Sequence, residues 1–230
     1  MPAIKGISAA LLALALAGPA LAEEHITVTG EGSVAARPDM ATITLGVVSE
    51  GATAAEAMAA NSDAVAKVMA ALSGAGIAEA DLQTSSLNVN PVYEDRTPQV
   101  PDDAPTLRAF QAQNMLTVRV RALDSLGAVL DGAVSAGSNQ IYGLGFGLAE
   151  TQPKLDEARR AAVADARRKA ELYAEAAGVK ITGVESIAED GGYARPMEMR
   201  TASFAKDVPV AEGELDMTAR VTVVFDFAAQ

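Results

Sequence analysis

The chain has 230 residues, a formal net charge of −12 and no cysteine. The negative charge opposes binding to nucleic acids and anionic lipid surfaces, and only 4% of the residues are aromatic, which leaves little for stacking bases. The lack of cysteine excludes disulfides, thiol nucleophiles and thiolate metal sites, so stability must come from packing.

Residues 1–22 have the features of a secretory signal peptide. Lys5 gives the N-terminal region a positive charge, an apolar stretch runs over residues 7–17, and Ala20-Leu-Ala22 is a small-residue cleavage signal. The apolar stretch is too short to span a bilayer, and no later stretch is long and apolar enough. The sequence therefore predicts cleavage after Ala22 and a mature chain that begins at Glu23, without a transmembrane helix.

Two strand patterns follow, over residues 25–34 and 40–48. Gly30-Glu-Gly32 lies inside the first, where we expect a kink or bulge, because no third glycine or helix follows as a phosphate-binding loop requires. Thr53 and Glu56 form a capping box, which predicts a helix that ends near Gly74. Its expected apolar stripe, with the methionines as core filler, is Met58, Val65, Val68, Met69 and Leu72.

A third strand is expected over residues 81–93 and a long fourth strand over 106–121. Between them, the proline-rich segment 94–105 predicts an exposed acidic loop rather than a metal site. Arg119 and Arg121 lie on the exposed face of the fourth strand and are candidates for an assembly edge. Asp124 begins a second predicted helix, which ends at Gly137.

Residues 139–148 form a strand with alternating glycines. Gly143, Gly145 and Gly147 leave one face bare, while Tyr142, Leu144, Phe146 and Leu148 make the other face bulky. A bare face allows another backbone to come close. The long helix that follows is therefore expected to cover these glycines, so that Gly145→Val would overpack the contact and severely destabilise the protein.

That helix is predicted from Thr151, its N-cap, to Ala177, with Gly178 at the C-terminal end. Its expected inner stripe consists mostly of small residues, namely Leu155, Ala158, Ala162, Ala166, Ala170, Tyr173 and Ala177. Its charged side chains are expected on a solvated outer face. Strands are then predicted over residues 179–187 and 214–227, with a short one near 204–210.

These elements predict an α+β fold of two intertwined α/β subdomains. The order β-α-β-β-α-β over residues 38–150 is ferredoxin-like. The second subdomain would combine residues 25–35 with residues 151–228, so both ends of the mature chain would lie together. Residues 23–230 would then form one domain after the signal peptide.

Several segments resemble the SIMPL-domain family, which includes periplasmic immunogenic proteins of Gram-negative bacteria. The resemblance covers essentially the whole mature chain, through the order and spacing of short motifs. They are Val28-Thr-Gly-Glu-Gly-Ser33, Pro38-Asp39, Asp81-Leu-Gln-Thr-Ser-Ser-Leu87, Pro91-Val-Tyr93, Val118-Arg-Val-Arg-Ala-Leu-Asp124, Ala136-Gly-Ser-Asn139, the helix with Glu157-Ala-Arg159 and Lys169-Ala170, Pro209-Val210 and Gly213.

The resemblance implies a two-part α+β fold, export to the periplasm or outer membrane, a link to stress protection, and large homo-oligomers in some members. The family has no agreed catalytic residues, so none is carried over. The sequence itself offers no catalytic, cofactor or metal constellation. We therefore expect a non-enzymatic protein that acts by self-assembly or by binding an envelope protein, in envelope or oxidative stress protection.

Two alternatives remain open. One is a hydrolase that uses only carboxylates, since the chain has 30 acidic residues. The other is Cu(II) or Ni(II) binding at the mature N-terminus Glu23-Glu24-His25. There the α-amine, two backbone amides and the His25 imidazole would supply four nitrogens in the square-planar arrangement these ions prefer.

Overall fold

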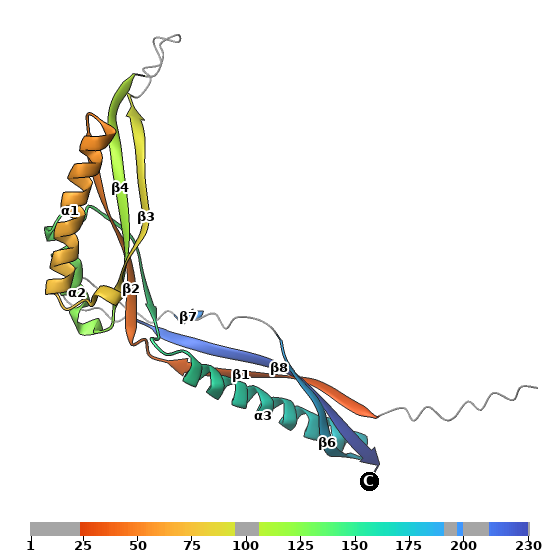
Figure 1. The fold of residues 1–230 in the computed structure, drawn as a ribbon. Coiled ribbons are helices and arrows are strands. Elements are labelled where there is room, and N and C mark those ends of the chain that lie inside the picture. The colour runs from red at the N-terminus through yellow and green to blue at the C-terminus, as the bar shows by residue number, and fades with distance from the viewer. Residues whose placement is uncertain (1–23, 95–105, 191–196, 200–211, 230) are drawn as a thin grey trace, which may run out of the picture.

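The computed structural model describes residues 24–94, 106–190, 197–199 and 212–229. These residues form two antiparallel sheets, each with helical cover on one face, in a bent molecule (Figure 1). The predicted α+β class is confirmed. The predicted signal peptide, most of the loop 94–105 and the short strand expected at 204–210 lie outside the described residues.

The central sheet contains β2 (Met40–Gly51), β3 (Leu82–Tyr93), β4 (Leu107–Val120) and β5 (Gln140–Gly147). Helix α1 (Ala54–Gly74) follows β2, and α2 (Leu126–Ser135) follows β4, with short 3₁₀ turns η1 (Glu79–Asp81) and η2 (Leu123–Ser125) before β3 and α2. The strands lie in the order β3-β4-β2-β5. This is the ferredoxin-like arrangement expected from the element order.

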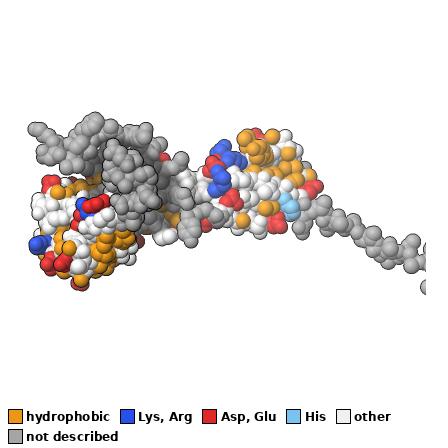
Figure 2. Space-filling model, turned by 90° about the horizontal axis from the view of Figure 1, so that it is seen from above, with side chains coloured by type: hydrophobic (Ala, Val, Ile, Leu, Met, Phe, Trp, Pro, Cys, Tyr) orange, Lys and Arg blue, Asp and Glu red, His pale blue; other side chains and the backbone are white. Residues whose placement is uncertain are grey.

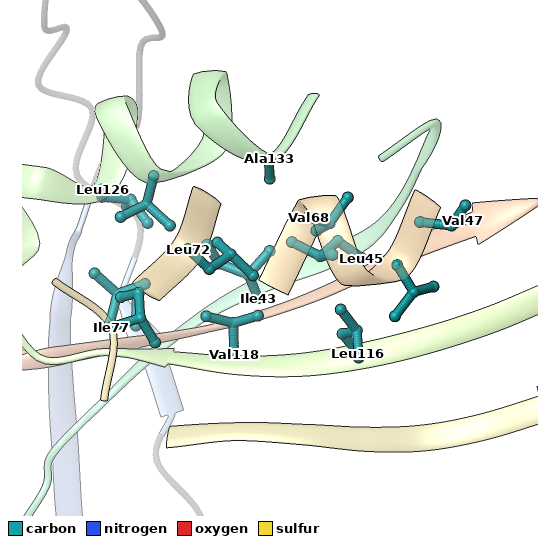
Figure 3. Close-up of a cluster of buried hydrophobic side chains, with 14 residues drawn as sticks. Ile43, Leu45, Val47, Val68, Leu72, Ile77, Leu116, Val118, Leu126 and Ala133 are labelled. Atoms are coloured by element: carbon teal, nitrogen blue, oxygen red, sulfur yellow. The ribbon is translucent and has the colours of Figure 1, made fainter. Parts of the chain in front are cut away.

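The core of the central sheet is made by alternating side chains of β2 and β4 beneath α1 and α2 (Figure 3). The capping box that begins α1 is present, because Glu56 N donates to Thr53 Oγ1 at 3.2 Å and Thr53 N donates to Glu56 Oε2 at 3.0 Å. Met69 is exposed, so its expected role as core filler is wrong. Asn61 is buried instead, and its amide donates to the carbonyls of Val47 and Ala112.

The terminal sheet contains β1 (His25–Ala36), β6 (Val179–Glu189), β7 (Met197–Met199) and β8 (Glu214–Ala229). Strand β8 lies between β1 and β6, so both ends of the described chain meet in this sheet. Helix α3 (Gln152–Ala177) packs on β1, β8 and β6. It ends at Gly178, whose φ of 70° is the left-handed conformation that glycine adopts most easily.

The closest approach of helix to strand lies at Gly30 and Gly32 of β1. A Cβ added at Gly30 would lie 2.0 Å from the carbonyl oxygen of Ala162, and one at Gly32 would lie 2.1 Å from that of Ala158. The expected kink or bulge at Gly30-Glu-Gly32 is wrong, because β1 pairs with β8 from His25 to Ala36 without a shift in register. The glycines instead let the helix backbone rest on the strand.

The glycines of β5 are not the partners of α3. Among the described residues, no atom lies within 4 Å of a Cβ added at Gly143, Gly145 or Gly147. The expectation that Gly145→Val would overpack a helix contact is therefore wrong. Although α3 follows β5 in the chain, it crosses to the terminal sheet, where its buried stripe is Ala158, Ala162, Ala166, Ala170 and Ala174. Tyr173 and Ala177, which were expected in this stripe, are exposed.

Two charged side chains of α3 bind the backbone of β1. Lys169 Nζ donates to the carbonyl of Thr29 at 2.8 Å, and Glu31 N donates to Asp165 Oδ2 at 3.1 Å. Because pairing alternates along an antiparallel strand, these backbone groups point away from β8. The charged side chains of α3 were expected only to face solvent. Asp165 and Lys169 instead bind backbone groups at the free edge of β1.

Asp39 joins the two places where the chain crosses between the sheets. The turn between β1 and β2 carries Asp39, and the segment between β5 and α3 carries Ala149. Asp39 N donates to the carbonyl of Gly147 at 3.0 Å, and Ala149 N donates to Asp39 Oδ1 at 2.7 Å. One residue, through its backbone amide and its carboxylate, therefore holds the two crossings together.

We expect Gly30→Ala to destabilise the protein by about 3 kcal/mol or more, at the upper end of the usual cost of overpacking. The added methyl group would meet the backbone of α3, which cannot rotate away as a side chain can. Urea unfolding of the mature protein, followed by circular dichroism, measures the effect.

Gly145→Ala is the matched control. It adds the same methyl group to a strand where no described atom lies within 4 Å. We expect the free energy of unfolding to change by less than about 0.5 kcal/mol. Equal losses in both variants would contradict the assignment of Gly30 to the helix contact.

Asp165→Asn tests the bond between α3 and β1 through its pH dependence. Hydrogen bonds from Lys169, Arg168 and the Glu31 amide hold the pKa of Asp165 well below its usual range. A depressed pKa stabilises the folded state above the unfolded value of about 3.9, and this contribution falls as the pH drops below it. The difference in urea midpoint between wild type and Asp165→Asn should therefore shrink as the pH falls from about 6 to about 3.

Asp156→Asn is the control for this comparison. Asp156 lies on the same helix and binds Arg159 at 3.0 Å, but its side chain is half exposed. Asp156→Asn should therefore lower the urea midpoint at pH 6 by less than Asp165→Asn does. A difference for Asp165→Asn that is constant over this pH range would contradict the account.

Candidate interaction surface

Among the described residues, no helix covers one face of the central sheet. Helices α1 and α2 lie on the opposite face (Figure 1). On the uncovered face, the register places Thr42 of β2 between Gly145 of β5 and Arg119 of β4, and Thr44 between Gly143 and Thr117. On this face, the side chains beside the β5 glycines are therefore the uncharged Thr42 and Thr44. They leave room for the backbone of another chain to come close to β5.

Strand β5 forms one edge of the central sheet. Its eight residues, Gln140 to Gly147, include no charged residue and no proline. Among the described residues, β5 pairs with β2 on one side and with no strand on the other. An edge strand without charge, proline or cover can accept another strand on its free backbone groups.

Strands β1, β6 and β3 also lie at sheet edges, and each has protection against such pairing, while β7, which pairs with β8, is only three residues long. On β1, Asp165 and Lys169 of α3 bind the outward backbone groups. Strand β6 carries Lys180, Glu185 and Glu189 and has two shifts in register against β8. Strand β3 contains Pro91 and also has two shifts. Charges, proline and bulges all discourage edge-to-edge pairing.

Tyr142 lies on a different face of β5 from the one expected. The register between β2 and β5 shifts between Thr44 and Leu45, which is a β-bulge that places Tyr142 outside the regular pairing. The ring then lies over Gly46, where an added Cβ would meet it at 3.2 Å, and its hydroxyl bonds with Gln113 and Gln140. Leu144 and Phe146 pack against the core beneath α1 and α2.

The start of β5 is anchored by Ser138 and Asn139. Asn139 pairs with the backbone of Val48 in both directions, accepting at 2.9 Å and donating at 2.8 Å. The buried hydroxyl of Ser138 donates to the carbonyl of Gly46 at 3.1 Å. These bonds hold β5 against β2 and leave the opposite side of the strand as the edge.

Arg119 and Arg121 do not supply an assembly edge, because β4 lies between β3 and β2. Arg121 instead holds the buried carboxylate of Asp81 through two hydrogen bonds of 2.7 Å. These bonds lower the pKa of Asp81 and raise that of Arg121. Both residues line a shallow depression of about 310 Å³ at the end of α1. Both arginines are exposed, as expected, but Arg121 stabilises a buried carboxylate within its own sheet.

His25 lies at the first residue of β1, opposite Asp226 of β8. Its Nδ1 is 3.2 Å from Glu185 Oε2 and 3.4 Å from Asp226 Oδ1. The sequence pointed to His25 but not to the two carboxylates, because they lie 160 and 201 positions away and share no motif. Only the strand order brings these three residues together.

Within the part of the chain that the structure describes, no helix is both long and apolar enough to cross a membrane.

Comparison with known proteins gives relatives over most of the chain. It is 38% identical over 242 residues to the 26 kDa periplasmic immunogenic protein of Brucella melitensis, covering 95% of this chain and 94% of that protein. It is 30% identical over 190 residues to the uncharacterized protein YggE of Escherichia coli, covering 83% and 75% of the two chains. Residues 26–225 match the SIMPL family model, described as a protein of unknown function (DUF541). The chain therefore belongs to the SIMPL family.

Proposed function

We propose that this protein is exported to the periplasm and acts there without catalysing a reaction, by associating with further copies of itself through β5. The observation that carries the proposal is the unprotected edge of β5, which differs from the protected edges at β1, β3 and β6. A second copy is a suitable occupant, because the same strand on two molecules can pair antiparallel across a two-fold axis. The glycines at its centre would let the two backbones approach.

Export is supported by the signal-peptide features of residues 1–22 and by the relatives that are named periplasmic proteins. From the family resemblance, the proposal also includes association with the outer membrane and a role in envelope or oxidative stress protection. A non-enzymatic role agrees with family members that are named without an activity. Another envelope protein that adds a strand to β5 would use the same edge.

The carboxylate hydrolase is the second candidate from the sequence. A general acid in such an enzyme needs a raised pKa. Among the described residues, two carboxyl groups have a clearly shifted pKa, Asp81 and Asp165, and in both the pKa is lowered by hydrogen bonds from cationic side chains. Asp81 lines a depression, but its oxygens are occupied by Arg121. The geometry thus supports association through β5 more strongly than hydrolysis.

We expect mature protein to form oligomers at micromolar concentrations and Ile141→Lys to shift it toward the monomer. Ile141 is 53% exposed on β5, and a lysine there would put a charge on the edge at which two β5 strands would pair, which discourages such pairing. Size-exclusion chromatography with light scattering measures the molar mass across a dilution series.

Val134→Lys is the matched control, because Val134 is also 53% exposed but lies on α2. It should associate like wild type. A monomeric wild type over the whole range would remove self-association, and oligomers of unchanged size in Ile141→Lys would place the contact elsewhere. Loss of a stable complex with one envelope protein, in Ile141→Lys alone, would favour the partner over the second copy.

The export proposal makes a separate prediction. Protein recovered from the periplasm should have lost residues 1–22, because Ala20-Leu-Ala22 is the cleavage signal. Intact mass spectrometry should give a chain that begins at Glu23. A mature start at any other residue would show that the predicted cleavage site is wrong.

A further inference from the structure

His25, Glu185 and Asp226 form a cluster of potential metal ligands on the terminal sheet, apart from the β5 edge. Each residue comes from a different strand, namely β1, β6 and β8, and β8 lies between the other two. All three lie on the face of the sheet opposite to α3. Figure 2 shows the single histidine, in pale blue, at the surface of the lobe that contains this sheet.

The distances from the imidazole nitrogen to the two carboxylates suit a shared metal ion. His25 Nδ1 is 3.2 Å from Glu185 Oε2 and 3.4 Å from Asp226 Oδ1, and all three atoms lie within 4.8 Å of one another. Zinc bonds to nitrogen and carboxylate oxygen are about 2.0–2.2 Å long, so neighbouring ligands at angles of about 90–110° are roughly 3.0–3.5 Å apart. Both distances from the imidazole fall within this range.

The local backbone of β6 helps to present the two carboxylates. The register against β8 shifts between Val184 and Ser186, so Glu185 is the extra residue of a bulge. Bulges re-aim a side chain and are frequent beside functional sites. Gly183, opposite Asp226, has no side chain, and an added Cβ would lie 3.2 Å from Asp226 Oδ2. A larger residue there would crowd this carboxylate.

We propose that His25, Glu185 and Asp226 bind one divalent transition-metal ion of the zinc type. One imidazole and two carboxylates suit such an ion, and the two negative charges balance its charge. Water would complete its coordination. Strands β1 and β6 both pair with β8 and not with each other, so the metal would link the two outer strands directly. It would stabilise the sheet at the end where the mature chain begins.

This site differs from the chelate at Glu23-Glu24-His25, although both use the His25 imidazole. The chelate needs the free α-amine and two deprotonated backbone amides, whereas the three-strand site uses side chains alone. Pairing of β1 with β8 already extends to Glu24, whose carbonyl accepts from Phe227 N at 3.3 Å. The ordered strand favours the side-chain site, because the chelate would have to pull Glu24 out of this pairing.

Isothermal titration of metal-free mature protein with Zn(II), without a polyhistidine tag, tests the proposal. We expect one equivalent to bind and the melting temperature to rise with the Zn(II) concentration. Glu185→Gln and Asp226→Asn should each weaken binding by at least about 10-fold, since loss of a direct ligand costs no less than loss of a residue that supports one. Glu31→Gln is the control, because Glu31 lies on the same face and pairs with Arg220 instead.

One further variant separates the two sites. A residue added before Glu23 moves the α-amine and blocks the chelate but leaves the three side chains in place, so Zn(II) binding should be retained. Circular dichroism of the metal-free variants confirms that they are folded. The proposal is overturned if Zn(II) does not bind, if binding survives both Glu185→Gln and Asp226→Asn, or if the added residue abolishes it.

Discussion

The structure depends on the close approach of α3 to β1. A helix whose buried stripe is entirely alanine has few apolar atoms to offer, so it gains contact only by lying very close to its sheet. Gly30 and Gly32 make this possible, because any side chain at these positions would overlap the helix backbone. Asp165 and Lys169 then bind the outward backbone of β1. Packing and hydrogen bonding thus act at the same place.

This contact also determines what remains open elsewhere. Once α3 is committed to the terminal sheet, no described helix covers the second glycine stripe, at Gly143, Gly145 and Gly147. The edge of β1 is occupied by the same helix that packs on it. Strand β5 is left as the edge without charge, proline or helical side chains. The proposed interaction surface therefore follows from where the long helix docks.

Much of the fold could be predicted from local patterns, and the errors concern contacts between distant segments. The capping box at Thr53, the glycine at position 178 and the alternation in β8 all depend on neighbouring residues. Two strands carry alternating glycines, however, and the alanine stripe fits either one. Proximity in the chain favoured β5, whereas the crossing held by Asp39 carries α3 to β1. The face of Tyr142 was missed because a bulge has no signature in this sequence.

Several motifs that carry the family resemblance have structural roles. Gly30 and Gly32 seat the helix, Asp39 joins the crossings, Asp81 binds Arg121, and Asn139 anchors β5. These roles explain why the motifs identify the fold without identifying a reaction. The candidate metal ligands were beyond sequence reasoning for another reason, since Glu185 and Asp226 meet His25 only through strand order.

Hydrogen–deuterium exchange at two protein concentrations tests most directly whether β5 is the surface through which the protein acts. Peptides that cover residues 140–147 should exchange more slowly at high concentration, because their outward amides would be paired with a second copy. Peptides that cover β1 should be equally protected at both concentrations, since α3 already occupies that edge. Exchange in β5 that does not depend on concentration, together with new protection on another strand, would contradict the account.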